Sequence, residues 1–276
     1  MNRMIPRLFA IVFVFGTASA AHAGMWLIDD TATLYSIDQQ TSPVVTVGNT
    51  GIGSATALTV DNNGSLFTTD GTSLYTLNRT TAAATLVDTY LGIGTLQGLA
   101  FDGTNSLWGV SGNDLYLLAN NGSGLFSWQA TLGGSYDDLA IAQTDITYSG
   151  GTILAGTLLG LDATGGGSFI YAIDTGTFVE TLIETIPLAV GDEAMTTDAG
   201  GGTLFTHNFN RESGGQGGVY EVDLTGANND TLVKITPGRI TGMFLEDTGA
   251  SVPVPAPALL IGGAFLGMMA KRRRAH

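Results

Sequence analysis

The segment Leu74-Tyr75-Thr76-Leu77-Asn78 indicates the fold, because related segments recur along the chain. Each copy begins with an aliphatic residue followed by tyrosine, and all but one continue through an aliphatic residue to Asp or Asn. The copies start at Leu34, Leu74, Leu115, Ile170 and Val219. Their separations of 40 to 55 residues are typical of a repeat protein in which each copy forms one structural unit.

Each copy lies within a run of short segments that alternate apolar and polar residues. In the second copy these segments are 57–61, 66–69, 74–78 and 84–88, and in the third they are 98–102, 107–110, 115–118 and 125–132. Gly, Asn and Asp separate them, which is typical of antiparallel strands joined by tight turns. Four strands per unit at this spacing indicate a blade of a β-propeller.

The two ends of the repeat region complement each other. Residues 26–29 align with the second strand of a blade, and residues 241–246 align with a first strand. Joining them would complete one more blade and remove the open strand edges of a linear array. The sequence therefore predicts an all-β domain over residues 24–247, a propeller of about five four-stranded blades. The alternative is a β-solenoid, whose coils are normally shorter than these repeats.

Composition narrows the chemistry. The chain has no cysteine, which excludes disulfides, thiol nucleophiles and zinc–thiolate sites. Its 24 Asp and Glu face only 10 Lys and Arg, and most of those basic residues lie at the two ends of the chain. A domain this acidic repels phosphate backbones, so we expect no nucleic-acid partner.

The first 23 residues have the anatomy of a secretory signal peptide. Arg3 and Arg7 form a positive n-region, residues 8–15 are apolar but too short to span a bilayer, and Ala21-His22-Ala23 is a small-x-small cleavage site. The sequence therefore predicts export and removal of residues 1–23.

Residues 248–276 form a tail of three parts. A proline box at 252–257 is followed by an apolar segment at 258–270 and a basic cluster at 271–274. Alternate prolines keep the box extended. The basic cluster is expected to stay cytoplasmic, which would hold the precursor in the inner membrane with its domain outside.

This tail resembles the PEP-CTERM class of sorting signals in its Val-Pro-x-Pro-Ala form. The matching residues are Val252, Pro253, Val254, Pro255 and Ala256 of the box and Arg272, Arg273 and Arg274 of the basic cluster. Val254 stands where most members have glutamate, so the nearer variant is Val-Pro-Leu-Pro-Ala. The resemblance implies recognition and tail removal by an exosortase-type membrane peptidase. It also implies a cell-surface or extracellular location linked to polysaccharide and biofilm.

Catalytic motifs are scarce. The chain has no Gly-x-Ser-x-Gly elbow, no His-Glu-x-x-His and no P-loop, and His207 is the only histidine between the two predicted processing segments. The Asp-rich turns that begin at Asp61, Asp102 and Asp198 lack the closing Glu of a calcium loop and favour bonding of Asp to its own turn backbone. The repeated tyrosines are interpreted as packing residues.

Polar residues gather at the start of each innermost strand, where a propeller channel opens. The alignment brings together Thr56, Gln97, Asp137, Asp138, Asp192, Glu193 and Thr241 as candidate ligand residues. Four of them are carboxylic acids, and Arg239 is the one basic residue near their level. The pattern predicts weak binding of a divalent cation, with Ca²⁺ favoured by the all-oxygen ligands.

The predicted function is that of an exported, non-catalytic surface or matrix protein that binds glycan, cation or another protein. The alternative is a metal-dependent, lactonase-like hydrolase on the same channel. An ordered metal held by several carboxylates and an Asn would favour that alternative.

Overall fold

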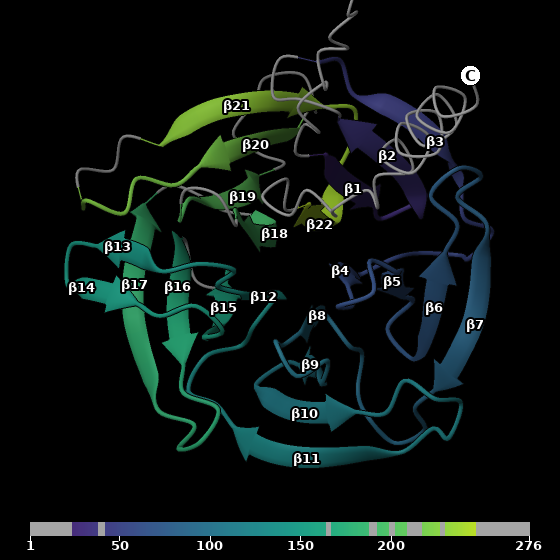
Figure 1. Cartoon of the computed structure of the whole chain (residues 1–276), viewed down its shortest axis with the longest axis horizontal. Helices are drawn as coiled ribbons and strands as arrows, with labels where there is room; N and C mark the ends of the chain where they lie inside the picture. Colours follow the sequence, from purple (N-terminus) through teal and green to yellow (C-terminus); the bar gives the residue numbers. More distant parts are fainter. Residues whose placement is uncertain are drawn as a thin grey trace, which may run out of the picture.

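The computed structural model describes residues 24–37, 42–163, 167–187, 192–198, 202–208, 217–226 and 230–246. Within these ranges the regular secondary structure is β-strand, and five four-stranded antiparallel sheets surround a common axis (Figure 1). The chain is therefore a five-bladed β-propeller, as the repeats predict. No helix in the described ranges has the length and apolar character needed to cross a bilayer.

The blades are numbered in chain order, and their strands are given from the axis outward. Blade 1 contains β22 (Ile240–Leu245), β1 (Met25–Asp29), β2 (Thr33–Ile37) and β3 (Val45–Asn49). Blade 2 contains β4 (Ala57–Val60), β5 (Leu66–Thr69), β6 (Ser73–Leu77) and β7 (Ala84–Thr89). Blade 3 contains β8 (Gly98–Phe101), β9 (Leu107–Ser111), β10 (Asp114–Leu118) and β11 (Phe126–Thr131). Blade 4 contains β12 (Asp138–Ile141), β15 (Leu158–Asp162), β16 (Gly167–Ile173) and β17 (Glu180–Pro187). Blade 5 contains β18 (Asp192–Thr197), β19 (Leu204–Asn208), β20 (Gly217–Glu221) and β21 (Thr231–Thr236).

The ring closes between the first and last described strands. β1 and β22 pair antiparallel, with Met25 opposite Leu245 and Ile28 opposite Gly242. This pairing confirms the prediction that residues 26–29 and 241–246 complete one blade. It also gives every innermost strand a neighbouring blade on both sides, so that no blade stands at the end of an open array.

A short hairpin accounts for the longest repeat spacing. β13 (Ile146–Tyr148) and β14 (Gly151–Ile153) pair with each other between β12 and β15. Ile146 and Ile153 are buried in the core cluster that blades 4 and 5 share, and the Ser149 N–H donates to the Leu224 carbonyl at 2.8 Å. The insertion therefore seals the outer part of the seam between these blades.

The recurring tyrosine marks a β-bulge in every blade. Pairing between the third and fourth strands shifts by one residue at the aliphatic–Tyr step each time. In blade 2, Leu74 faces Asp88 and Tyr75 faces Leu86, which leaves Val87 as the extra residue, packed against a core cluster. All five blades share this bulge in the fourth strand, which explains why the sequence repeat is clearest at the aliphatic–Tyr pair.

The tyrosine hydroxyls bond to the turns, which supports the packing interpretation. Tyr35 donates to Asp29 at 2.8 Å, and Tyr75 donates to Asp70 at 2.9 Å. Burial, followed by the bond to Asp29, raises the pKa of Tyr35 to about 12.

The innermost strands approach closely at one aligned position per blade, which is Gly or Ala in four of the five blades. Glycine stands at two of these positions, where a Cβ on Gly98 would lie 2.5 Å from the Leu139 nitrogen and one on Gly242 would lie 2.3 Å from the Leu58 nitrogen. The aligned positions in the five blades are Gly242, Ala57, Gly98, Asp138 and Ala194. Backbone contact between neighbouring blades therefore limits side-chain size around the channel.

We predict that Gly242→Ala lowers the free energy of unfolding by about 3 kcal/mol, because the new methyl group collides with backbone atoms of blade 2. Gly103→Ala is the matched control, since a Cβ there meets nothing within 4 Å. Urea unfolding of both variants would measure the difference. Equal losses would contradict the close approach of β22 and β4.

Candidate functional site

The central channel has two mouths. The innermost strands β22, β4, β8, β12 and β18 begin at the mouth called upstream here and end at the downstream mouth. Every candidate residue from the sequence belongs to the upstream mouth, where these strands begin. The structure gives these residues several different roles.

Two of the candidates join neighbouring blades. The Thr241 hydroxyl donates to the Ala55 carbonyl at 2.8 Å, and the Thr56 hydroxyl donates to the Leu96 carbonyl at 2.7 Å. Each bond runs from one blade to the segment that leads into the next innermost strand. These aligned threonines are therefore structural ties, and their hydroxyls are already engaged within the ring.

The next two candidates bond within their own blades. Gln97 Oε1 accepts from the Gly112 N–H at 2.7 Å, which fixes the turn between β9 and β10. Asp137 Oδ2 accepts from the Ala163 N–H at 2.9 Å. Burial raises the pKa of Asp137, the carboxylate of Asp162 acts in the same direction, and Arg239 opposes them. Arg239 thus lies within electrostatic reach of Asp137, at the level that the alignment predicts.

Asp138 occupies the close-approach position of blade 4 and is completely buried. Its Oδ1 accepts from the Leu139 N–H at 2.8 Å, and its Oδ2 accepts from the Met195 N–H of blade 5 at 2.7 Å. Burial raises the pKa of Asp138 well above its usual range in spite of these two bonds. The carboxylates of Asp137 and Asp138 therefore have partners in different blades and do not form one cluster.

The calcium site stays a prediction. Asp192 and Glu193 begin β18, but their side chains lie outside the described residues. Among the side chains that the structure describes, no group of three or more His, Asp and Glu is arranged to hold a metal ion.

His207 is a buried part of blade 5. Its Nε2 lies 3.0 Å from the Thr236 hydroxyl, which donates to the Gly238 carbonyl at 3.1 Å. Burial, with a smaller contribution from Arg239, lowers the pKa of His207 to about 3. The imidazole is therefore neutral at ordinary pH and connects β19 to β21.

The downstream mouth opens into a funnel of about 310 Å³. Its wall is largely apolar, and polar groups of the turns after the innermost strands form its rim. Wall residues include Val60, Leu99, Phe101, Ile141, Met195 and Phe244, and the rim includes Asp61, Asn62, Asp102 and Gln143.

The rim carboxylates organise their own turns, as the sequence predicts for Asp61 and Asp102. Asp61 Oδ1 accepts from the Ser65 N–H at 2.7 Å, and Asp102 Oδ1 accepts from the Ser106 N–H at 3.0 Å. Burial works against ionisation of Asp102, but hydrogen bonds from Thr104, Trp108 and Ser106 lower its pKa. Asp102 is therefore held as a carboxylate, and the turns of both acids form a fixed rim.

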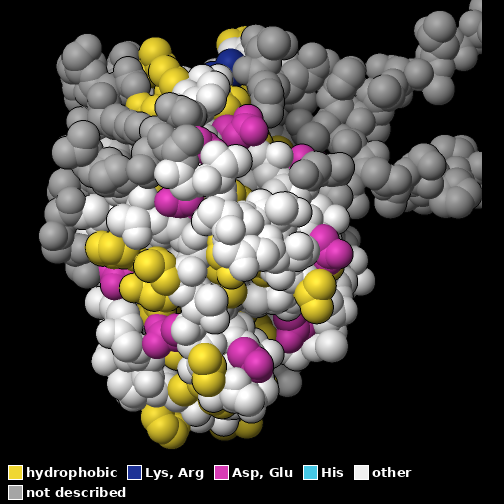
Figure 2. Space-filling view, turned by 90° about the vertical axis from the view of Figure 1, so that its left-hand side faces the viewer, with side chains coloured by type: hydrophobic (Ala, Val, Ile, Leu, Met, Phe, Trp, Pro, Cys, Tyr) yellow, Lys and Arg dark blue, Asp and Glu magenta, His cyan; other side chains and the backbone are white. Residues whose placement is uncertain are grey.

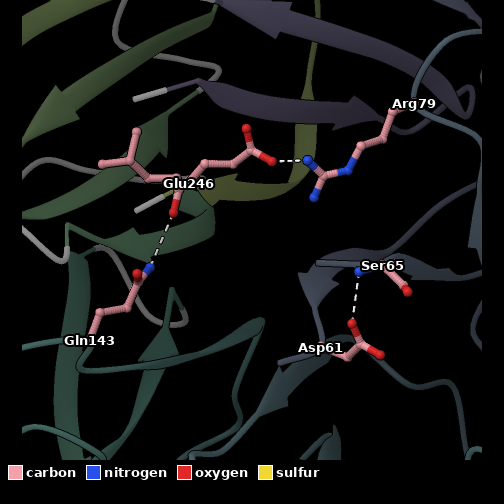
Figure 3. A network of polar contacts seen from close by, with 6 residues as sticks. Asp61, Ser65, Arg79, Gln143 and Glu246 are labelled. Atoms are coloured by element: carbon pink, nitrogen blue, oxygen red, sulfur yellow. Dashed lines mark hydrogen bonds and ion pairs between the residues drawn. The ribbon is translucent and has the colours of Figure 1, made fainter. Parts of the chain in front are cut away.

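Side chains also connect several blades across this mouth (Figure 3). Gln143 Nε2 donates to the Thr197 carbonyl at 2.8 Å and to the Leu245 carbonyl at 3.2 Å, which joins blades 4, 5 and 1. Arg79 of blade 2 forms an ion pair with Glu246 and lies 5.3 Å from the centre of the Trp26 ring. Arg79 thus contacts both the first strand of the domain, through Trp26, and Glu246 after the last strand.

A repeated aspartate in the sequence marks the turns at the downstream mouth. Asp61, Asp102 and Asp198 each directly follow an innermost strand, and their N–H groups bond to the carbonyls of Ser65, Ser106 and Thr203. Their pattern predicts turn formation and nothing more, because the funnel that the turns surround depends on the spacing of the blades.

Comparison with known proteins supports the fold. No protein-family model matches the chain, and no curated protein sequence matches it. A chain of the nidogen/laminin complex is 12% identical, covers 83% of this chain and 100% of its own length, and has a TM-score of 0.55. TolB from Acinetobacter baumannii is 15% identical over 78% of this chain and 53% of its own, with a TM-score of 0.43. Virginiamycin B lyase from Staphylococcus aureus, in a catalytically inactive form, is 13% identical over 76% of this chain and 65% of its own, with a TM-score of 0.42. At these identities the likeness concerns the fold alone.

Because Asp138 is buried, the stability of the protein should depend on the protonation of its carboxyl group. An acid whose pKa is raised on folding binds its proton more readily in the folded state, so protonation favours folding as the pH falls toward the unfolded value of about 3.9. We expect the unfolding free energy of the wild type to rise relative to that of Asp138→Asn as the pH is lowered from 7 to 4.

Asp114→Asn is a control of opposite sign. Hydrogen bonds from Thr131 and Trp128 lower the pKa of the partly exposed Asp114, so the wild type should lose stability relative to this variant as the pH falls below the unfolded value of about 3.9. Denaturant titrations at each pH would measure both differences. A pH-independent difference for Asp138→Asn would show that its carboxylate is not buried between the blades.

Proposed function

We propose that this protein is an exported, non-catalytic surface propeller that binds an extracellular ligand at the funnel of the downstream mouth. The observation that carries the proposal is the funnel itself, an apolar hollow with a fixed polar rim on the axis of a closed ring. A volume of about 300 Å³ is at the lower limit for small-molecule sites. The ligand that fits is a single compact group, such as one sugar unit at a chain end.

The bonding of the acids supports binding rather than catalysis. Asp61 and Asp102 each accept at least two backbone N–H bonds from their own turns, and Asp138 is buried between blades. A general acid or base needs a proton that it can exchange with a substrate. In their present geometry these carboxylates instead stabilise the walls of the channel.

Export and sorting are supported by the sequence of both ends. The ring ends at Glu246, whose N–H donates to the Gly24 carbonyl at 2.8 Å. Cleavage after residue 23 and within the proline box would therefore leave every described strand intact. An exosortase-type peptidase is the proposed processing partner, and the cell surface or extracellular matrix is the proposed location.

Processing makes a testable prediction. Mass spectrometry of the protein from its native host should find neither residues 1–23 nor the basic cluster at 271–274. A Pro253→Ala/Pro255→Ala variant should retain its tail and stay in the inner membrane, because the extended box is lost while the basic flank remains. Recovery of extracellular wild-type protein with an intact tail would rule out the sorting proposal.

Filling the funnel tests the binding site. Val60 lies on the funnel wall and is partly exposed, so Val60→Trp should narrow the funnel and weaken binding to the host's isolated matrix at least tenfold. Val45→Trp is the control, because Val45 is exposed on the outer strand β3. Sedimentation with matrix would measure binding, and thermal unfolding would check the fold. Equal binding by both variants would show that the ligand does not bind in the funnel.

A further inference from the structure

The outermost strands carry a second repeated position. In each blade, one residue of the fourth strand lies directly opposite the repeat tyrosine, just beyond the bulge. These residues are Thr46, Leu86, Trp128, Leu182 and Leu232. The last four are exposed by 58%, 57%, 48% and 39% respectively. Apolar side chains at this position therefore face solvent around most of the ring.

The outer face of blade 4, which carries one of these positions, is acidic. Figure 2 shows hydrophobic side chains interspersed with carboxylates over the outer face that carries β13, β14 and β17. Isolated exposed leucines of this kind are normal on a protein surface.

Blade 3 differs, because its exposed residues are aromatic. Phe126 lies two residues before Trp128 and so projects from the same face of β11, and it is 37% exposed. Tyr116 faces Trp128 across the strand pair, and its ring meets Phe126 edge to face at 5.8 Å. Three rings thus lie side by side on one strand pair, and we call Tyr116, Phe126 and Trp128 the aromatic platform.

Hydrogen bonds orient the platform. The indole N–H of Trp128 donates to Asp114 Oδ1 at 3.2 Å, and the Thr131 hydroxyl donates to the same oxygen at 2.6 Å. A tryptophan that is largely exposed and also held by a bond is pre-organised for contact, since less rotamer freedom is lost on binding. Leucine, which stands at the same position in three of the other blades, would provide apolar area without a flat ring.

Polar groups border the rings. The Thr131 hydroxyl and the Asp114 carboxylate lie on the same face as Trp128, whereas the side chains of Ser127 and Gln129, which bond to each other at 2.8 Å, lie on the opposite face. The side chains of β11 are uncharged, and Asp114 is the nearby carboxylate in contact with the indole. Flat rings beside a hydroxyl group and a carboxylate suit a ligand with an apolar face and polar edges.

We propose that the aromatic platform binds an uncharged polysaccharide. The C–H face of a pyranose ring would stack on the indole, where the negative face of the ring attracts it, and the sugar hydroxyls would reach the bordering polar groups. The net charge of −14 disfavours a polyanion, and it also disfavours pairing with a second copy of the same chain. This site is on the outer rim of blade 3 and is independent of the funnel.

Tryptophan fluorescence allows a direct test on the exported protein. The chain has 3 tryptophans, and of these Trp108 is buried whereas Trp128 is exposed. The probes are cellohexaose, maltohexaose, laminarihexaose and galactan, with polygalacturonate as the anionic comparison. We expect at least one neutral probe to protect Trp128 from acrylamide quenching, and Trp128→Ala to weaken its binding at least tenfold by calorimetry.

Control variants distinguish the aromatic platform from the funnel and from a general loss of stability. Leu182→Ala removes the equivalent exposed residue of blade 4 and should bind within twofold of the wild type. Trp128→Phe should retain most of the affinity because it keeps a ring, and its unfolding temperature would show whether the fold is intact. If Val60→Trp alone lost binding, the funnel would hold the sugar and this proposal would be wrong.

Three further results would overturn the proposal. One is that no neutral probe binds, or that polygalacturonate binds more tightly. Another is an equal loss of affinity in Trp128→Ala and Leu182→Ala. The third is sedimentation showing a wild-type dimer that Trp128→Ala dissociates, which would identify the platform as a self-association surface.

Discussion

The antiparallel pairing of β1 with β22 is the interaction on which the rest of the structure depends. The chain has no cysteine, so covalent cross-links cannot hold the blades in a circle. Each blade packs only against its neighbours, and an open array would expose the end blades to water. Pairing across the ends fixes the spacing of the innermost strands, and that spacing determines the shape of both mouths. The ion pair of Arg79 with Glu246 and its position over Trp26 strengthen the same junction.

The innermost strands of neighbouring blades lie in close contact, and polar residues at the centre of the ring therefore form hydrogen bonds that hold the blades together. Thr56 and Thr241 bond to the preceding turns of their neighbours, and Asp138 bonds to the backbone of blade 5. A carboxylate is a costly choice between two strands, since it must be desolvated. Its two backbone bonds offset part of that cost. The space available for a ligand lies instead at the downstream mouth, where the strands diverge into turns.

The repeats predict most of the fold because a propeller blade is a local structure. The spacing of Tyr35, Tyr75 and Tyr116 indicates the blade period, and the alternation of apolar residues places most strands close to their observed bounds. The hairpin at 146–153 could not be foreseen, since only a longer spacing indicated it.

Side-chain direction is the harder problem for the candidate site. Alignment puts Asp137 and Asp138 at the correct level, yet adjacent residues of a strand point to opposite faces. The partners that each face meets depend on the distance between blades, and this distance comes from residues such as Gly98 and Gly242. The aromatic platform is hidden in the sequence for a related reason. Trp128 does not stand out there until the bulge shows that it faces solvent.

Ring closure also imposes an order of events on a chain that is synthesised from its N-terminus. Met25 and Leu245, which lie opposite each other, are separated by almost the whole domain. The edge of β1 that pairs with β22 therefore stays unpaired until β22, the last strand of the domain, has been synthesised. Blades 2 to 5 can form meanwhile from neighbouring segments. The half-finished ring is the stage most exposed to aggregation, and its duration is set by the rate at which the last blade arrives.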